Sequence, residues 1–204
     1  MKVLLLNGSP RSNGNTYIAL EEISKTLALE GIDSEIFQIG TEPISGCIAC
    51  GGCNTEDKCI IEDRVADFIE AMNKCDGLIV GTPVYYASPA GSLISLLDRA
   101  FYSSDFSHKP AAAVACARRA GTTAALDVIN KYFSISQMPI VSSTYWNMVH
   151  GRRAGEAAMD AEGLQTMRNL AKNMAWMLKC IEAGKNAGIQ LPEAERSSIT
   201  NFIR

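Results

Sequence analysis

Residues 2–16 read KVLLLNGSPRSNGNT, an apolar run followed by a polar loop that leads into a helical pattern from Tyr17. An apolar strand that feeds a glycine-containing loop and a helix start brings several free backbone N–H groups around one point, where an anion can sit. The loop also offers hydroxyl and amide groups, from Ser9, Ser12, Asn13, Asn15 and Thr16. The segment predicts a phosphate site, and the alternative is a purely structural turn.

Arg11 carries the only full positive charge of this loop. A helix terminus contributes about 0.3–2 kcal/mol toward an anion, whereas a hydrogen bond to a charged group adds about 1.5–3 kcal/mol. We therefore expect Arg11 and the hydroxyls to decide the affinity of the site.

Composition places the chain among ordinary globular proteins. Its 204 residues suffice for one well-buried domain, with 47% hydrophobic and 20% charged residues. A net charge of −3 is too small to predict a nucleic-acid partner or an anionic membrane surface, and no apolar run reaches membrane-spanning length. We expect a cytoplasmic protein with no nucleic-acid partner and no membrane partner.

Apolar runs and helical patterns alternate along the chain. The predicted strands are residues 2–7, 33–39, 77–81, 111–117 and 139–145. The predicted helices are residues 16–30, 63–74, 90–101, 122–133 and 157–183. The alternation predicts one α/β domain over residues 1–190, with a parallel sheet covered by helices on both faces. A polar tail over residues 191–204 ends in Asn201–Arg204, which either docks on the body or a partner subunit or remains disordered.

Ligands of such sheets bind beyond the carboxyl ends of the strands, where the loops after the first, third and fourth strands converge. The loop after the third strand contains Thr82–Tyr86, TPVYY. Pro83 biases Thr82 away from helical geometry, so the chain leaves the strand extended and presents backbone N–H and C=O groups. Tyr85 and Tyr86 supply flat aromatic surface with a polar tip, unless they merely cover the core.

Residues 8–16, together with residues 82–86, resemble the NADPH-dependent FMN reductase and iron–sulfur flavoprotein group of flavodoxin-like proteins, over about residues 1–180. The resemblance implies a three-layer sandwich with strand order 2-1-3-4-5 and FMN at the reversal between the first and third strands. It assigns the FMN phosphate to Ser9, Arg11, Asn13, Asn15 and Thr16. It assigns the isoalloxazine and ribityl region to Pro83, Val84, Tyr85 and Tyr86.

The loop after the fourth strand carries Arg118, Arg119 and Gly121 and is expected to flank the flavin. A cation or N–H dipole near the pyrimidine end of the ring stabilises the anionic reduced flavin and favours two-electron chemistry. One-electron flavodoxins, by resemblance, are strongly acidic around the flavin, whereas this chain places two arginines there. We therefore expect a reductase rather than a pure electron carrier, with solvated surface arginines as the alternative.

Residues 40–62 lack periodicity and contain four of the seven cysteines, inserted after the second strand. The spacing C-x2-C-x2-C-x5-C is formed by Cys47, Cys50, Cys53 and Cys59. Three cysteines at that spacing can wrap a compact cluster, and a fourth can close it. The spacing also resembles the cluster motif of iron–sulfur flavoproteins. We expect a [4Fe–4S] cluster, with zinc on four thiolates or a metal-free loop as the alternatives.

These features predict an FMN-dependent oxidoreductase that takes hydride from NAD(P)H. Electrons are expected to pass to a small-molecule acceptor such as a quinone, free flavin or azo compound, or through the cluster to a protein acceptor. No catalytic side chain is assigned, because the flavin would carry the reaction and the protein would position it. The alternatives are a flavodoxin-like electron carrier and a zinc-binding or redox-sensing module.

The resemblance also implies a homodimer or homotetramer, because flavin sites in the family commonly lie at subunit contacts. The last predicted helix offers apolar surface for such a contact, at Leu170, Met174, Met177 and Leu178. The three cysteines outside the loop are expected to be buried as small apolar residues; they are Cys75, Cys116 and Cys180.

Overall fold

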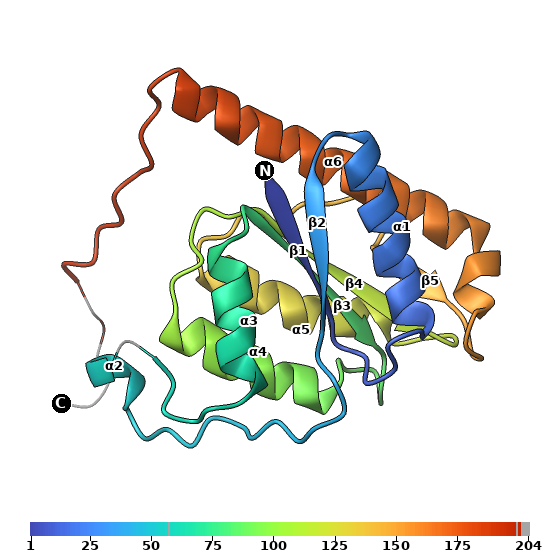
Figure 1. The fold of residues 1–204 in the computed structure, drawn as a ribbon, viewed down its shortest axis with the longest axis horizontal. Coiled ribbons are helices and arrows are strands. Elements are labelled where there is room, and N and C mark those ends of the chain that lie inside the picture. Colours follow the sequence, from blue (N-terminus) through green and yellow to red (C-terminus); the bar gives the residue numbers. More distant parts are fainter. Residues whose placement is uncertain (57, 199, 201–204) are drawn as a thin grey trace.

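The computed structural model describes residues 1–204 except Asp57, Ile199 and residues 201–204. The described chain forms a five-stranded sheet in the order β2-β1-β3-β4-β5, and each neighbouring pair is parallel (Figure 1). The strands are β1 (Lys2–Asn7), β2 (Asp33–Gln38), β3 (Gly77–Pro83), β4 (Ala111–Ala117) and β5 (Met148–His150). The expected α/β class and strand order are confirmed. The expectation for Asn201–Arg204 lies outside the described residues.

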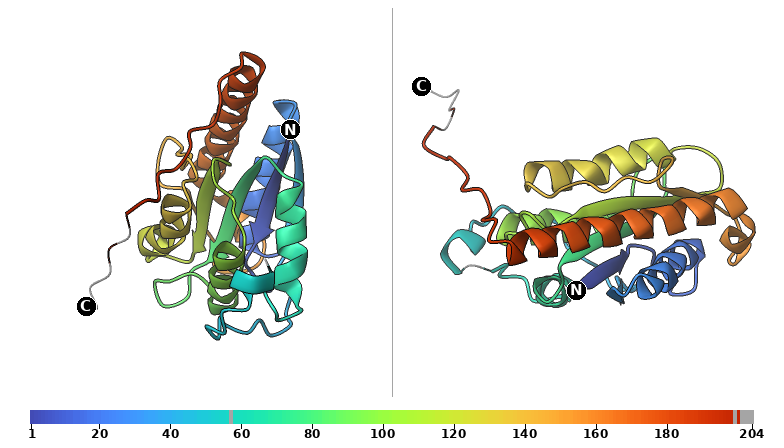
Figure 2. Two further views of the ribbon diagram at one scale, coloured as in Figure 1. Left: turned by 90° about the vertical axis from the view of Figure 1, so that its left-hand side faces the viewer. Right: turned by 90° about the horizontal axis from the view of Figure 1, so that it is seen from above.

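Helices connect the strands along the chain. They are α1 (Asn15–Leu29), α2 (Cys53–Glu56), α3 (Arg64–Asn73), α4 (Gly91–Ser103), α5 (Thr122–Ile135), the 3-10 helix η1 (Glu156–Met159) and α6 (Ala161–Asn186). Figure 2 shows α6 running along one side of the molecule, with the following segment leaving its end in extended form. Within the described ranges, no helix combines the length and apolar character needed to cross a membrane.

The apolar run of β1 explains why helices cover both faces of the sheet. Successive side chains of a strand point to opposite faces, so an unbroken apolar run makes both faces apolar. Leu4 and Leu6 lie in a core with side chains of α3, α4 and α5. Val3 and Leu5 lie in a second core with side chains of α1 and α6. Burying each of these four side chains is worth about 1.5–3 kcal/mol, and β1 therefore belongs to the middle layer of three.

The fifth strand differs from its prediction at residues 139–145. Within that range, a single bridge joins Ile140 to Ala111 at the start of β4. The regular strand β5 comes later, and Met148 pairs with Ala115 near the carboxyl end of β4. The prediction was wrong because the chain leaves the sheet between Val141 and Asn147, the residues on either side of this loop that still bond to β4.

Contacts with α6 explain this interruption. Ser143 Oγ donates to the Thr166 carbonyl at 2.7 Å, and Asn173 Nδ2 donates to the carbonyl of Ser142 at 2.7 Å, so the segment is held away from β4. The side chain of Asn147 donates instead to the Ala113 carbonyl, at 3.0 Å. A side-chain amide thus replaces a backbone donor that a continuous strand would have provided.

The last helix also differs from its prediction at residues 157–183. The chain first forms η1, and α6 begins at Ala161 because the Asp160 carboxylate accepts from Gly163 N at 2.9 Å and caps the helix. The apolar residues expected on the helix surface face the interior instead. Leu170, Met174 and Leu178 are buried, and Met177 packs partly buried against the same core. The expectation of apolar helix surface was therefore wrong for Leu170, Met174 and Leu178, whereas a subunit contact elsewhere on the molecule stays a prediction.

Candidate functional site

The loop after β1 is fixed to the carboxyl ends of three strands. Gly8 N donates to the Gly81 carbonyl of β3 at 2.8 Å, and a Cβ on Gly8 would lie 2.8 Å from that oxygen. Ser9 N donates to Asn7 Oδ1 of β1 at 3.2 Å. Gln38 Nε2 of β2 donates to the Ser9 carbonyl at 2.6 Å. The polar loop therefore has a defined position at the strand-order reversal, where the sequence places it.

The expected phosphate-binding residues lie on and beneath this loop. Arg11 and Asn13 are exposed, whereas Ser9 and Thr16 are buried at its base. Gly14 is the N-cap residue of α1 and has an extended backbone. Among the described residues, no side-chain hydrogen bond caps this end of the helix. The backbone N–H groups of the first turn of α1 can therefore serve an anion.

The Asn15 side chain joins two segments of the chain at this edge of the molecule. Its Nδ2 donates to the Arg153 carbonyl at 2.9 Å, and its Oδ1 accepts from Ala157 N at 3.1 Å. Gly151 allows the close approach, because a Cβ there would lie 2.6 Å from Asn15 Nδ2. Asn15 thus holds the segment after β5 against the loop after β1.

The loop after β3 ends in a tight turn that presents Tyr86. Tyr85 and Ser88 exchange two backbone hydrogen bonds of 2.9 Å. Between them, Tyr86 and Ala87 have φ values of 51° and 58°, a left-handed conformation that costs non-glycine residues about 1–3 kcal/mol each. The Tyr86 side chain is fully exposed and that of Tyr85 is half exposed. The alternative that both tyrosines cover the core is therefore wrong.

The loop after β4 packs against this turn. Gly121 has a φ of 91°, and a Cβ on it would lie 2.7 Å from Ala87 Cα. Arg118 and Arg119 precede it and are exposed. The loops after β3 and β4 are thus in contact, and their aromatic and basic side chains belong to one edge of the sheet.

His150 links a further part of the chain to this edge. Its Nε2 lies 3.1 Å from the Arg119 carbonyl oxygen, and its backbone N–H donates to Asp160 Oδ2 at 2.7 Å. It lines a small cleft of about 150 Å³ between β5 and α6, together with the exposed side chains of Tyr145 and Trp146. Sequence reasoning missed His150 because a single histidine without a partner at a defined spacing carries no pattern.

The cysteine-rich segment between β2 and α3 runs to α2 and back below α4 (Figure 1). A cavity of about 350 Å³ is lined by all four of its cysteines, Cys47, Cys50, Cys53 and Cys59. All are free thiols, and the chain bends between them through φ values of 53° at Ala49 and 72° at Gly51. Among the described residues, no three Cys, His, Asp or Glu side chains converge as ligands of one metal ion. Four thiols that line one cavity supply the donor set that a [4Fe–4S] cluster takes in proteins.

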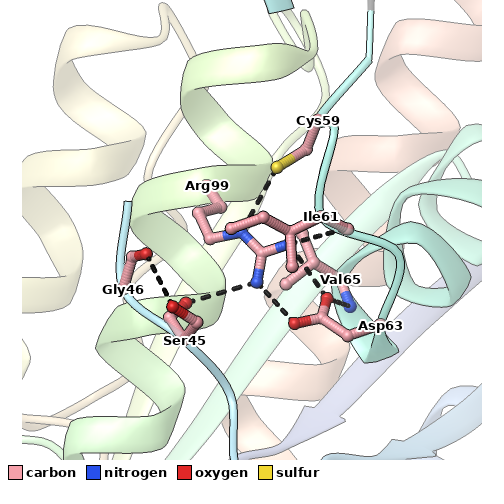
Figure 3. Close-up of polar contacts among 7 residues, drawn as sticks. All are labelled: Ser45, Gly46, Cys59, Ile61, Asp63, Val65 and Arg99. Carbon is pink, nitrogen blue, oxygen red and sulfur yellow. Dashed lines mark hydrogen bonds and ion pairs between the residues drawn. The ribbon is translucent and has the colours of Figure 1, made fainter. Parts of the chain in front are cut away.

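Arg99 of α4 forms a wall of this cavity and holds the loop (Figure 3). Its Nε donates to Cys59 Sγ at 3.3 Å, and its Nη atoms donate to the Asp63 carboxylate at 2.6 and 3.0 Å. They also donate to the carbonyls of Ser45 at 3.2 Å and Ile61 at 2.8 Å. The Arg99 side chain is 1% exposed. Sequence reasoning missed it because an arginine in a helical pattern indicates a solvated face.

The cysteines outside the loop divide by burial. Cys75 and Cys116 are buried, as expected, and burial raises the pKa of the Cys116 thiol to about 12 and also raises the pKa of the Cys75 thiol. Both thiols therefore remain protonated near neutral pH. Cys180 is exposed on α6, so its expected burial was wrong.

This sheet order, with a polar loop between β1 and α1 and an aromatic turn after β3, defines a protein of the flavodoxin-like class. Residues 1–153, which contain all of the loops expected to touch a flavin, match the family described as NADPH-dependent FMN reductase. The chain belongs to this family and is an oxidoreductase.

Individual relatives agree with this assignment. The chain is 33% identical over 192 residues to an iron–sulfur flavoprotein of Methanocaldococcus jannaschii, and the alignment covers 89% of this chain and 100% of the relative. The solved structure of RosB with a bound intermediate, 8-demethyl-8-formylriboflavin-5'-phosphate, is similar with a TM-score of 0.71 and 15% identity, over 100% of this chain and 92% of that chain. An NAD(P)H:quinone oxidoreductase from Methanothermobacter marburgensis is similar with a TM-score of 0.66 and 16% identity, over 85% of this chain and 96% of that chain. The two solved structures support the fold.

Proposed function

We propose that this oxidoreductase binds FMN at the carboxyl edge of its sheet, takes electrons from NAD(P)H, and relays them through a [4Fe–4S] cluster held by the cysteine loop. The observation that carries the proposal is that the loop after β1 is bonded to the carboxyl end of β3, while the loops after β3 and β4 contact each other, all inside the family-matched residues. Bound FMN supplies hydride-accepting and electron-donating chemistry in one ring system.

The loop after β1 binds the phosphate in this proposal. The exposed guanidinium of Arg11 supplies charge, and the amide of Asn13 adds a donor. The hydroxyls of Ser9 and Thr16 and the first N–H groups of α1 complete the donor set. Asn15 contributes by position, because its amide already holds the segment after β5.

The ring and ribityl chain then lie against the turn after β3. Val84 N donates to the Cys116 carbonyl of β4 at 2.9 Å, which fixes the segment from Pro83 onward, and Tyr85 and Tyr86 offer aromatic faces. Opposite them, Gly121 allows the chain after β4 to approach closely. The neighbouring cations, Arg118 and Arg119, favour a negatively charged reduced ring.

The cluster assignment depends on the donor set. Four free thiols around one cavity suit iron–sulfur chemistry, and the relative from Methanocaldococcus jannaschii is named an iron–sulfur flavoprotein. A bound cluster supplies one-electron transfer. The electron acceptor is then a small molecule or a protein that reaches the cluster or the flavin. Zinc on the same thiolates would give a redox-inert site and a different function.

Anaerobic purification followed by cofactor analysis tests the proposal. We expect about one FMN and about four iron and four sulfide per chain, with rapid bleaching of the flavin absorbance on stopped-flow mixing with NADPH. Protein that neither contains nor takes up FMN would contradict the flavin site. FMN-bound protein that NADPH does not bleach would indicate an electron carrier, and zinc in place of iron would contradict the cluster.

A further inference from the structure

One buried side chain, Arg99, joins the two ends of the cysteine loop. Its acceptors lie on both sides of the cysteine-rich segment: Ser45 precedes the first cysteine, whereas Cys59, Ile61 and Asp63 follow the third (Figure 3). The five donor–acceptor pairs engage all three guanidinium nitrogens, and the planar fork fits this arrangement in a way that a lysine ammonium does not. Arg99 therefore fixes the spacing between the two ends of the loop.

A buried ion pair, Arg99 with Asp63, lies beside the Cys59 sulfur. The Arg99 guanidinium is almost fully buried, and its carboxylate partner Asp63 is 21% exposed at the side chain. Removing one member of a buried ion pair leaves the other uncompensated in a medium of low dielectric constant. Replacing Arg99 removes positive charge near Cys59, and replacing Asp63 removes negative charge. The two replacements therefore change the electrostatic potential at Cys59 in opposite directions.

We propose that Arg99 is a positioning residue that holds Cys59 as a cluster ligand through its Nε–H···Sγ hydrogen bond and raises the reduction potential of the cluster. This inference rests on the proposed function, because it requires the [4Fe–4S] group. Reduction adds one electron to the cluster, and a hydrogen bond to a ligand sulfur together with a neighbouring cation stabilises that added negative charge.

Two substitutions test the sign of the effect. Arg99→Met removes the hydrogen bond and leaves the Asp63 carboxylate unpaired, so the reduction potential should fall. Asp63→Asn leaves the Arg99 charge unpaired, so the potential should rise. Asparagine is also a good N-cap, and it can still accept the bond from Val65 N that starts α3. Asp67→Asn is the matched control, because it removes a carboxylate from the exposed face of the same helix.

The measurement is an anaerobic titration with dithionite, which donates the electron, followed through the EPR signal of the reduced cluster. At a fixed ambient potential we expect the ratio of reduced to oxidised cluster to change by about tenfold, downward for Arg99→Met and upward for Asp63→Asn, which corresponds to about 59 mV for one electron. Asp67→Asn should match the wild type. Unchanged potentials, or shifts of the same sign in both variants, would overturn the proposal, since general loosening of the loop would move both the same way.

A second readout uses cluster-free protein. Hydrogen–deuterium exchange over residues 44–62 should be faster in both Arg99→Met and Arg99→Lys than in the wild type, because neither replacement restores the fork. Equal exchange in all three proteins would contradict the positioning role. Iron and sulfide counts on the wild type distinguish the two proposals: protein without a cluster would overturn the proposed function, whereas a cluster whose potential ignores Arg99 would overturn this inference alone.

Discussion

Arg11 carries the only formal charge on the loop after β1, and its exposed side chain has room to meet a phosphate. Arg11→Ala should weaken FMN binding by about 10- to 150-fold, because a hydrogen bond to a charged group is worth about 1.5–3 kcal/mol. Fluorescence titration of cofactor-stripped protein measures this change.

Riboflavin provides the matched probe for Arg11, because it has the same ring without the phosphate. Its affinity should be nearly the same in wild type and Arg11→Ala. Lys172→Ala, which removes an exposed cation from α6, should leave FMN binding unchanged. Equal FMN affinity in wild type and Arg11→Ala would place the phosphate elsewhere.

Ala87 tests whether the turn after β3 is strained. Its φ of 58° is rare for a residue with a Cβ, and glycine adopts this conformation without that cost. Ala87→Gly should therefore raise the free energy of unfolding by about 1 kcal/mol. Ala124→Gly, at an exposed position of α5, should lower it by about 0.5–1 kcal/mol. Urea denaturation of the two variants distinguishes these outcomes, and destabilisation of Ala87→Gly would show that the turn is not strained.

At the scale of elements, Asp160 joins the end of β5 to the start of α6. Its carboxylate accepts from Gly163 N at 2.9 Å and from His150 N at 2.7 Å. Asp160→Ala should lower the free energy of unfolding by about 1–2 kcal/mol, because it removes a helix cap and leaves backbone donors unpaired. The two donors use different carboxylate oxygens, so Asp160→Asn can keep the bond from Gly163 N but places an NH2 group against His150 N, and it should lose about half of that. A loss of the same size in both variants, by chemical denaturation, would mean that the helix cap at Gly163 N contributes little to stability.

The sequence predicted correctly the strands whose bounds depend on their own residues. β1 and β4 have the predicted bounds, because a short unbroken apolar run between polar segments is typical of a strand buried on both faces. β5 was misplaced, because hydrogen bonds from α6 to the segment around Ser142 decide where the edge strand pairs, and the partners are far away in sequence. The face of α6 was misjudged for the same reason, since Leu170 could equally have met a partner subunit.

In the candidate site as well, the sequence indicates some residues, whereas others depend on contacts that only the fold creates. Motif residues such as Arg11 and Tyr86 could be predicted because loop composition and position after a strand indicate them, and their contact with a flavin stays a prediction. Arg99 and His150 were missed, because their importance comes from the acceptors that the fold brings to them. Asn15 was correctly placed at the loop, but its hydrogen bonds to Arg153 and Ala157 could not be predicted, because 138 residues separate Asn15 from Arg153.

At the scale of the whole molecule, α4 connects the two candidate redox sites. Its N-terminal end follows the turn after β3, where Ala90 N donates to Thr82 Oγ1 at 3.1 Å. Its other end carries Arg99 and faces the cysteine cavity. Eight residues separate Gly91 from Arg99, and a rise of about 1.5 Å per residue places them about 12 Å apart. The two candidate sites therefore lie toward opposite ends of one helix.

This separation predicts that flavin binding does not require the cysteine ligands. Among residues 40–56 and 58–62, only Ile44 packs against either core, where it is partly buried. Replacing Cys53 and Cys59 with serine should abolish iron uptake and leave FMN affinity within about twofold of wild type, because effects at sites more than about 7–10 Å apart combine with errors of only ~0.5 kcal/mol. Fluorescence titration with FMN and an iron assay on the same preparation measure both quantities. Loss of FMN binding in the serine variant would show instead that the cysteine-rich segment supports the flavin site, with α4 as the element that joins the two.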